Sequence, residues 1–292
     1  MSSLLIFFLK LISHLPLWVL YKIGSVLGWL LLNVFHYRKN VILSNISTSF
    51  PKKSKAEIDF IMREYYRYLS DVMVETIALW NIDKQELMKR CRFENPELLK
   101  PYESNSRNVI IMMGHSGNWE WAGLATELYF NFTILPVYRS VKDPVINHFL
   151  RTIRSRFGSH PVLDSIAFSE IKKHDSPHAV AMLADQTPGA KKGWWIEFLN
   201  QPTPFFRGSE ILAKRLNYDV VFAHVKRENR GYYCIKLSKF DGNKEDEYVL
   251  TTAFAKFLEM QIKQQPENWL WSHKRWKHQP NEKSIWMEGN AK

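Results

Sequence analysis

From residue 109 onward, strand-like and helical stretches alternate along the chain, and this alternation limits the fold more than any other feature of the sequence. Short apolar runs with strand character span 109–113, 132–137, 178–183, 194–199, 220–225 and 232–237. Segments with helical spacing of apolar residues lie among them at 119–130, 144–157, 209–216 and 251–265. Such alternation is typical of domains in which helices cover the faces of one sheet. The sequence therefore predicts an α/β fold with a central mixed sheet flanked by helices.

The amino-terminal residues 4–35 are almost wholly apolar or aromatic, but Lys10, His14, Pro16 and Lys22 interrupt them. The uninterrupted pieces are shorter than the roughly 20 apolar residues of a membrane-spanning helix. A secretory signal is not indicated either, because no positive charge precedes the apolar stretch and no small-residue cleavage site follows it. Two interpretations remain: a helical segment that lies in or enters the membrane interface, and a helical hairpin packed in the core.

Membrane contact is the interpretation that we favour for this segment. Its two lysines can extend to the interface while Trp18, Tyr21 and Trp29 lie at headgroup depth. The basic run 36–39 that follows would keep the rest of the chain on the cytoplasmic side. We therefore divide the chain into an apolar membrane-associating helical segment, residues 1–38, and one α/β domain, residues 39–292.

The chain of 292 residues is strongly basic, since 40 Lys and Arg against 29 Asp and Glu give a formal net charge of +11. This balance indicates an acidic partner: nucleic acid, an anionic membrane, a phosphorylated substrate or an acidic protein. Aromatic residues make up 14% of the chain, but they lie in apolar runs rather than as stacking platforms, and no nucleic-acid-binding module is recognisable. Nucleic acid is therefore the least favoured of these partners.

The motif that carries the most chemistry is 114–120, Gly-His-Ser-Gly-Asn-Trp-Glu, which joins a strand-like run to a helix. His115 falls at the carboxyl end of the strand, where open α/β sheets build their sites. Glu120 falls in the first helical turn, where we expect its carboxylate to lie near the imidazole. The carboxylate would stabilise the imidazolium while the other ring nitrogen takes a proton from a substrate hydroxyl. Backbone N–H groups at the helix start would stabilise the oxyanion.

The same residues allow other interpretations. Glu120 can simply complement the helix dipole, with residue 116, 117 or 118 as the helix cap. The tripeptide 114–116 also begins the G-x-S-x-G pattern of serine hydrolases, which would make Ser116 a nucleophile. That pattern fails at its last position, where Asn118 stands in place of glycine.

Nucleotide-binding loops and metal-binding clusters are not indicated by the sequence. Neither a G-x-x-x-x-G-K-[ST] loop nor a G-x-G-x-x-G fingerprint occurs, and the histidines are scattered. The two cysteines, Cys91 and Cys234, lack a C-x-x-C neighbour, which excludes a disulfide framework and suggests a reducing compartment. We therefore expect neither a metal nor a resident cofactor.

The segment His115 to Glu120 resembles the H-x4-[D/E] signature of glycerolipid acyltransferases and, in its fuller form, the motif of the bacterial lipid A biosynthesis acyltransferases. Further matches to that family follow in its order: the apolar amino-terminal segment and the stretches 45–51, 138–139, 183–186, 207–208 and 266–277. The resemblance covers nearly the whole chain. It implies a glycerolipid-acyltransferase-like fold, with residues 39–292 as the catalytic domain.

The activity implied by this resemblance is O-acyl transfer at the cytoplasmic face of a bacterial inner membrane. An acyl chain would pass from acyl carrier protein, or from coenzyme A, to a hydroxyl of a lipid A precursor. His115 would be the general base and Glu120 its orienting partner. Other members of the family acylate different membrane glycolipids or aminolipids, so these acceptors remain an alternative, as does a catalytically inert membrane-associated scaffold.

The resemblance also assigns five substrate-binding positions. Arg139, Arg154 and Arg207 match basic positions suited to a phosphate or to the phosphopantetheine of the donor, since Arg forms bidentate phosphate contacts. Gly208 belongs to the same match as Arg207, and Asp185 matches a site position of the family. An alternative for Arg154 is an exposed helix face, where long basic side chains are common.

Overall fold

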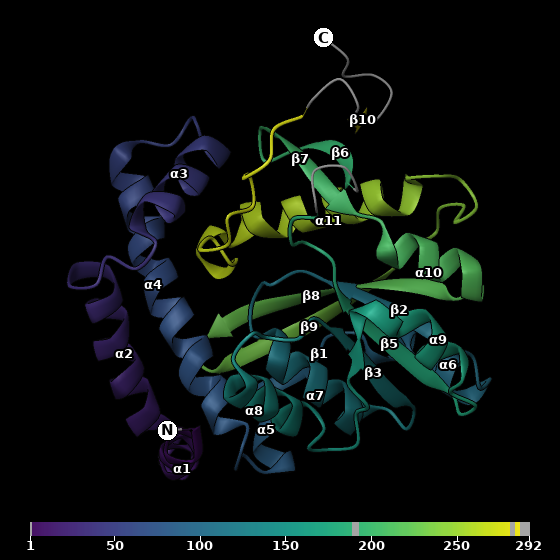
Figure 1. Cartoon of the computed structure of the whole chain (residues 1–292), viewed down its shortest axis with the longest axis horizontal. Coiled ribbons are helices and arrows are strands. Elements are labelled where there is room, and N and C mark those ends of the chain that lie inside the picture. Colours follow the sequence, from purple (N-terminus) through teal and green to yellow (C-terminus); the bar gives the residue numbers. More distant parts are fainter. Residues whose placement is uncertain (1, 189–192, 281–283, 287–292) are drawn as a thin grey trace.

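A computed structural model describes residues 2–188, 193–280 and 284–286, so the outer ends of the predicted ranges 1–38 and 39–292 lie outside the described residues. A seven-stranded mixed sheet forms its centre (Figure 1). Its strands, in spatial order, are β1 (Cys91–Phe93), β9 (Tyr232–Lys239), β8 (Asp219–Asn229), β2 (Val109–Met113), β5 (His178–Leu183), β3 (Thr133–Tyr138) and β4 (Val162–Leu163).

Strands β8, β2, β5, β3 and β4 run parallel to one another, so their carboxyl ends share one edge of the sheet. The β8–β9 pairing is antiparallel, which makes the sheet mixed, as predicted. All five residues of β2 are buried because helices cover both faces. The edge formed by the carboxyl ends is therefore where side chains from several strands can meet around a ligand.

Helices form a layer on each face of the sheet (Figure 1). One apolar core joins the sheet to α10 (Gly208–Leu216) and α11 (Val249–Gln264), and a second joins it to α5 (Lys84–Arg90), α7 (Trp119–Tyr129) and α8 (Pro144–Arg154). The helices predicted at 119–130, 144–157, 209–216 and 251–265 are thus confirmed. The shorter helices α6 (Lys100–Ser104) and α9 (Ala167–Lys172) lie among these connections.

A small sheet of β10 (Ile285–Trp286), β6 (Gly193–Phe198) and β7 (Gln201–Phe206) lies beside the central one. Strand β7 was not predicted, because its sequence contains Pro202 and Pro204 and proline is rare inside sheets. Among the described strands, β7 pairs with β6 alone and forms an edge of the sheet. At an edge a strand tolerates residues that cannot donate a backbone hydrogen bond.

The amino-terminal part is helical, with α1 (Ser2–Ser13), α2 (Leu17–Asn33) and α3 (Lys39–Ser49) grouped around the long helix α4 (Lys55–Ala78) (Figure 1). A capping box between Ser54 and Glu57 starts α4. Helix α2 buries Leu20, Gly24 and Gly28, and the two glycines lie against the α4 surface. In the described part of the chain, no helix is both long enough and apolar enough to cross a bilayer.

Candidate active site

The register between β2 and β5 brings His115 and Asp185 together. Met113 and Leu183 are paired as the last residues of these parallel strands, and each strand is followed two residues later by one of the polar side chains. The Nδ1 atom of His115 lies 2.5 Å from Oδ1 of Asp185, and the backbone N–H of His115 donates to Oδ2 at 2.8 Å. The imidazole is thereby fixed at the carboxyl edge of the sheet.

Asp185 is held as a carboxylate by its surroundings. Burial opposes its charge, but the neighbouring His115 and the hydrogen bonds that it donates lower the pKa of Asp185 below the usual range. The indole Nε1 of Trp269 donates a further hydrogen bond at 2.8 Å. An ionised Asp185 accepts hydrogen bonds only, so the proton of the neutral imidazole belongs on Nδ1 and the lone pair on Nε2.

Gln186 and Trp119 complete the surroundings of the imidazole. The amide Nε2 of Gln186 lies 3.2 Å from Nε2 of His115, so the amide donates to the lone pair of the ring. The Trp119 ring packs edge-on against the imidazole, with ring centroids 5.0 Å apart. Gln186 is exposed, so its amide can leave the imidazole when another donor arrives.

Glu120 does not make the predicted hydrogen bond to His115. Within the described residues its carboxylate pairs with Arg154, at 2.8 Å and 2.5 Å, and accepts from Nε1 of Trp119 at 3.2 Å. Burial opposes ionisation, but attraction to Arg154 outweighs it and the pKa of Glu120 is lowered. The reason for the difference is geometric: α7 directs Glu120 toward α8, while the segment that follows β5 supplies the carboxylate that reaches the imidazole.

The turn between β2 and α7 requires glycine at position 117. Gly117 has a φ of +59°, and a Cβ there would lie 2.2 Å from the carbonyl oxygen of Val225. The Tyr68 hydroxyl donates to the carbonyl of Gly117 at 2.7 Å, and the Gly117 N–H donates to the carbonyl of Asn268 at 3.0 Å. The turn is therefore held between α4 and the carboxyl-terminal tail.

Three backbone N–H groups between the end of β2 and the first turn of α7 are already occupied. The N–H of His115 donates to Asp185, that of Gly117 to Asn268, and that of Trp121 to the side chain of Asn118, the cap of α7. The capping interpretation of this segment is therefore confirmed for Asn118. The Gln186 amide is a further donor beside His115, and because this side chain is exposed it can turn toward a ligand.

The buried carboxyl group of Glu75 is hydrogen-bonded to the turn between β2 and α7. Glu75 of α4 accepts hydrogen bonds from Asn118 at 2.7 Å, from Tyr233 at 2.7 Å and from Tyr21 at 2.9 Å. Its burial raises the pKa of Glu75 to about 7, although the hydrogen bonds from Tyr233 and Asn118 oppose this shift. Glu75 thus ties α2, α4, α7 and β9 together beneath the site.

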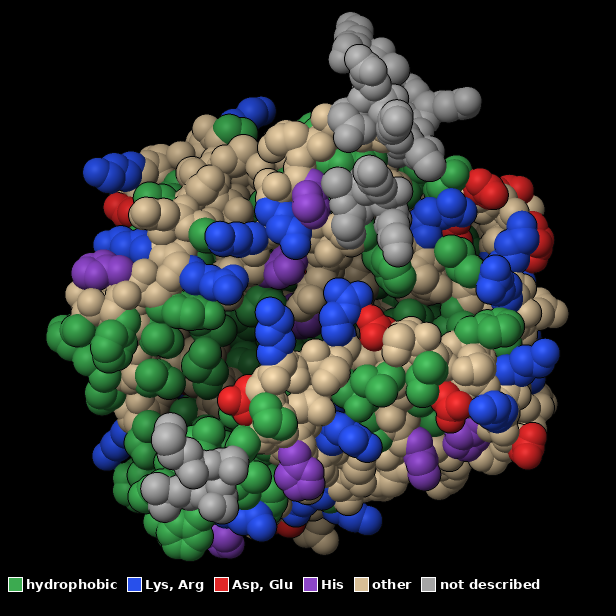
Figure 2. All heavy atoms as spheres, in the orientation of Figure 1, with side chains coloured by type: hydrophobic (Ala, Val, Ile, Leu, Met, Phe, Trp, Pro, Cys, Tyr) green, Lys and Arg blue, Asp and Glu red, His purple; other side chains and the backbone are tan. Residues whose placement is uncertain are grey.

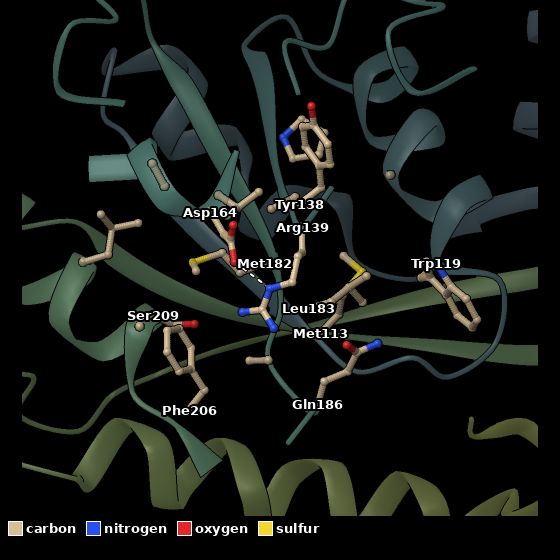
Figure 3. Close-up of a pocket in the computed structure, with 18 of the residues that line it drawn as sticks. Met113, Trp119, Tyr138, Arg139, Asp164, Met182, Leu183, Gln186, Phe206 and Ser209 are labelled. Carbon is tan, nitrogen blue, oxygen red and sulfur yellow. Dashed lines mark hydrogen bonds and ion pairs between the residues drawn. The ribbon is translucent and has the colours of Figure 1, made fainter. Parts of the chain in front are cut away.

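His115 opens into a cavity of about 620 Å³ at the carboxyl edge of the sheet. Its walls are mostly apolar, and Arg139 and Asp164, whose side chains lie 2.8 Å apart, stand at its exposed side (Figure 3). Trp119 lies on one side of the cavity, and Phe206 and Ser209 lie on the other (Figure 3). A cavity of this size and character suits an apolar ligand with few polar groups.

The remaining predicted positions differ in how close they come to this cavity. Arg139, Arg154 and Gly208 line it. Arg207 does not appear in its wall: its guanidinium stacks on Tyr248, 3.9 Å from the ring centroid, and pairs with Glu210 at 3.2 Å. Among the described residues, no three His, Cys, Asp or Glu side chains are arranged to hold a metal ion.

Comparison with known proteins decides the family. The model of the family described as bacterial lipid A biosynthesis acyltransferase matches residues 1–278. The chain belongs to this family. As a member of this family, the protein is an acyltransferase. The matched region contains His115, Glu120 and Asp185.

Curated relatives of the chain are distant in sequence, but their alignments cover nearly all of it. It is 22% identical over 283 residues to the lipid A biosynthesis palmitoleoyltransferase of Escherichia coli K12, an alignment that covers 94% of this chain and 90% of the relative. It is 24% identical over 279 residues to a lipid A biosynthesis acyltransferase of Haemophilus influenzae, covering 92% and 88% of the two chains. The lauroyltransferase of E. coli K12 is 22% identical, with 93% and 90% covered.

Proposed function

We propose that the protein transfers a fatty acyl chain from a thioester of acyl carrier protein or coenzyme A to a hydroxyl of a lipid A precursor. The observation that carries this proposal is the imidazole of His115, which Asp185 holds through Nδ1 and which borders an apolar cavity. The family match supports the lipid acceptor, and the relatives named as palmitoleoyl and lauroyl transferases support the fatty acyl group. Arg139 lines the cavity and is suited to bind a phosphate of the acceptor. The net charge of +11 favours association with an acidic carrier protein.

The geometry suggests a direct transfer without a covalent enzyme intermediate. The acceptor hydroxyl takes the place of the Gln186 amide and donates to Nε2 of His115, which removes the proton as the oxygen attacks the thioester carbonyl carbon. Asp185 stabilises the imidazolium formed in this step. The C–S bond then breaks, the imidazolium returns its proton to the leaving thiolate, and the ester remains on the acceptor.

The displaced Gln186 amide is then free to donate to the carbonyl oxygen as its negative charge develops. Replacing Gln186 with Ala should lower kcat roughly 10²- to 10³-fold, the loss typical of removing one oxyanion donor, with little change in the KM for the donor. Gln186→Glu is the matched control, because it keeps the shape of the side chain and removes its N–H donors. Steady-state kinetics in which Gln186→Glu retains wild-type kcat would contradict this role.

A reconstituted reaction tests the proposed function itself. The purified protein is incubated with a phosphorylated lipid A precursor and with lauroyl thioesters of acyl carrier protein or coenzyme A, and the lipid product is followed by mass spectrometry. We expect the acceptor mass to increase by one lauroyl group, and the preferred thioester identifies the donor. Acylation of a different membrane glycolipid or aminolipid in a mixed lipid extract, with none of the lipid A precursor, would favour that alternative acceptor class.

We also propose that α1 and α2 lie on the membrane surface. Apolar side chains gather over these two helices in Figure 2, on the side of the molecule away from the sheet. Helix α2 thus has two apolar faces, one packed on α4 and one exposed. The exposed large side chains in this region are Leu5, Phe7, Phe8, Leu11, Leu15, Trp18, Ile23, Val26, Trp29, Val34 and Phe35. Exposed apolar patches of this kind mark interaction surfaces, and basic residues beside an interfacial helix suit the anionic cytoplasmic face of a bacterial inner membrane.

Removal of the exposed apolar groups should release the protein from lipid vesicles. Trp18 and Phe35 are 63% and 66% exposed, so Trp18→Ser with Phe35→Ser should leave the fold unchanged. Removing each apolar side chain from the interface should weaken the free energy of membrane binding by about 1 kcal/mol or more. The partition coefficient onto vesicles should therefore fall at least about tenfold. Flotation with anionic lipid vesicles measures this. Deleting residues 1–38 is a poorer test, because it would expose the α4 surface that α2 covers.

The matched control for this experiment is the pair Val249→Ser and Met260→Ser. Both residues are exposed apolar positions on α11, which lies far from α1 in Figure 1. This control should float like the wild type. Equal loss in both double variants, or no loss in either, would contradict a membrane surface formed by α1 and α2.

A further inference from the structure

The cavity beside His115 reaches both faces of the central sheet. Successive residues of a strand point to opposite faces, and Ala181 and Leu183 pack on the α7 side while Met182 and Ala184 pack on the α10 side. All four of these residues line the same cavity. The cavity therefore passes over the carboxyl edge of β5 and has two branches, one against each helical layer.

We call these the α7 branch and the α10 branch. The α7 branch is lined by Gly123, Leu124, Pro136, Ser159, Ala181 and Leu183. The α10 branch is lined by Ala167, Phe168, Met182, Ile211 and Leu212. His115 lines the same cavity at the carboxyl edge of the sheet, which suits a reaction that joins two substrates.

The α7 branch is the more enclosed of the two. Leu124 and Ser159 in its wall are 2% and 5% exposed. In the α10 branch, Phe168 and Ile211 are 39% and 43% exposed, and Arg139 stands at the open side of the cavity. Of the acidic and basic groups near the α7 branch, Glu120 and Arg154 pair with each other. Glu127, beside the backbone of Ser159, has its pKa raised to about 8 by burial, which favours the uncharged carboxyl at neutral pH. An enclosed, uncharged branch suits a hydrocarbon chain, whereas a phosphorylated head group needs the open, basic side.

Gly123 is a position of α7 that neither its backbone conformation nor its packing explains. It lies in the middle of the helix, where glycine is less favourable than alanine, and its backbone is not in the left-handed region. A Cβ built at Gly123 would meet no atom within 4 Å, so no neighbour requires its absence. What glycine provides here is open space in the wall of the α7 branch.

We propose that Gly123 determines donor specificity: the missing side chain lets the acyl chain of the donor lie against α7, and the space there limits the chain length that the enzyme accepts. This inference rests on the proposed acyl transfer and names a residue that decides which acyl group is moved. Position 123 follows Glu120 by three residues and lies on the same face of α7. A larger side chain there would therefore project into the α7 branch. It should therefore exclude long chains before short ones.

The test is a graded series, Gly123→Ala, Gly123→Leu and Gly123→Met, assayed with decanoyl, lauroyl, myristoyl and palmitoyl thioesters. We expect the ratio of kcat/KM for the palmitoyl thioester to kcat/KM for the decanoyl thioester to be roughly tenfold lower or more in Gly123→Leu than in the wild type. Discrimination of this size is typical of one extra methylene in an apolar pocket. Gly123→Ala should change this ratio least and should raise the melting temperature, because alanine favours the helix. Gly123→Met, unbranched and flexible, keeps the test decisive if the leucine variant does not fold.

Ile211→Trp provides the control in the other branch. It adds bulk to the α10 branch and should leave the palmitoyl-to-decanoyl ratio unchanged while raising the KM for the acceptor. An unchanged ratio in folded Gly123→Leu and Gly123→Met would overturn the inference, as would a change confined to the acceptor KM. A wild-type enzyme without activity toward any thioester would instead contradict the proposed function, so the two failures are distinguishable.

Discussion

Replacing His115 with Ala should abolish acyl transfer while the fold remains intact. A general base contributes roughly 10²- to 10⁴-fold to a rate, and here the imidazole also returns the proton to the leaving thiolate. The loss should appear in kcat, since His115 contacts the reacting hydroxyl rather than the acyl chain. The side chain lies at the end of a strand and is partly exposed to the cavity, so its removal leaves both apolar cores untouched. Thioester turnover and the thermal unfolding midpoint, measured on the same preparation, check both parts.

Ser116→Ala is the matched control for this prediction. The Ser116 hydroxyl is buried, does not line the cavity and has no hydrogen-bond partner among the described residues. Its loss should therefore leave transfer unchanged, and it removes an unsatisfied polar group from the interior. A hydrolase that used Ser116 as its nucleophile would behave in the opposite way: Ser116→Ala would be inactive, and an acyl adduct could be trapped on the serine. Full activity in His115→Ala would rule out the proposed mechanism.

The sequence predicts the place of His115 better than it predicts its partner. The apolar run 109–113 followed by Gly-His locates the imidazole at the carboxyl edge of a strand, and the structure agrees. The expected partner, Glu120, was close in sequence, whereas the carboxylate that contacts the ring comes from residue 185. One signal could have found it: Asp185 also lies two residues beyond an apolar strand, and parallel neighbours bring such positions together. Strand order, which the sequence does not reveal, decides that β2 and β5 are neighbours.

Other parts of the site depend on contacts between distant segments. Trp269 lies in the stretch 266–277, to which the sequence assigned no separate role, yet its indole N–H donates to Asp185. Glu75 lies in α4 and no sequence motif marks it, yet it accepts three hydrogen bonds at the turn. Gly123 is unremarkable in sequence and becomes informative only when its surroundings are known to be empty. Local patterns thus predict the elements, and tertiary register decides which polar groups meet.

Replacing Asp185 with Asn should lower kcat far more than replacing Glu120 with Gln. An amide at position 185 can direct N–H toward Nδ1 of His115, which places the ring proton on Nε2 and removes the base, so we expect a loss of roughly 10²- to 10⁴-fold. Glu120 acts one step away: its carboxylate holds Trp119, whose ring packs on the imidazole. A Gln there still accepts from Trp119, so kcat should fall only about tenfold, the cost of weakening one hydrogen bond.

Stability should respond in the opposite order. Glu120→Gln leaves Arg154, whose side chain is 20% exposed, without its anionic partner, and breaking a buried pair in this way costs a few kcal/mol. Asp185→Asn keeps the shape of the side chain, and its amide oxygen can still accept from the backbone N–H of His115 and from Trp269, so its free energy of unfolding should change less. Paired measurement of kcat and unfolding free energy therefore separates the two carboxylates. If Glu120→Gln instead lost activity as severely as Asp185→Asn while its stability stayed at the wild-type level, Glu120 rather than Asp185 would be the group that orients the base.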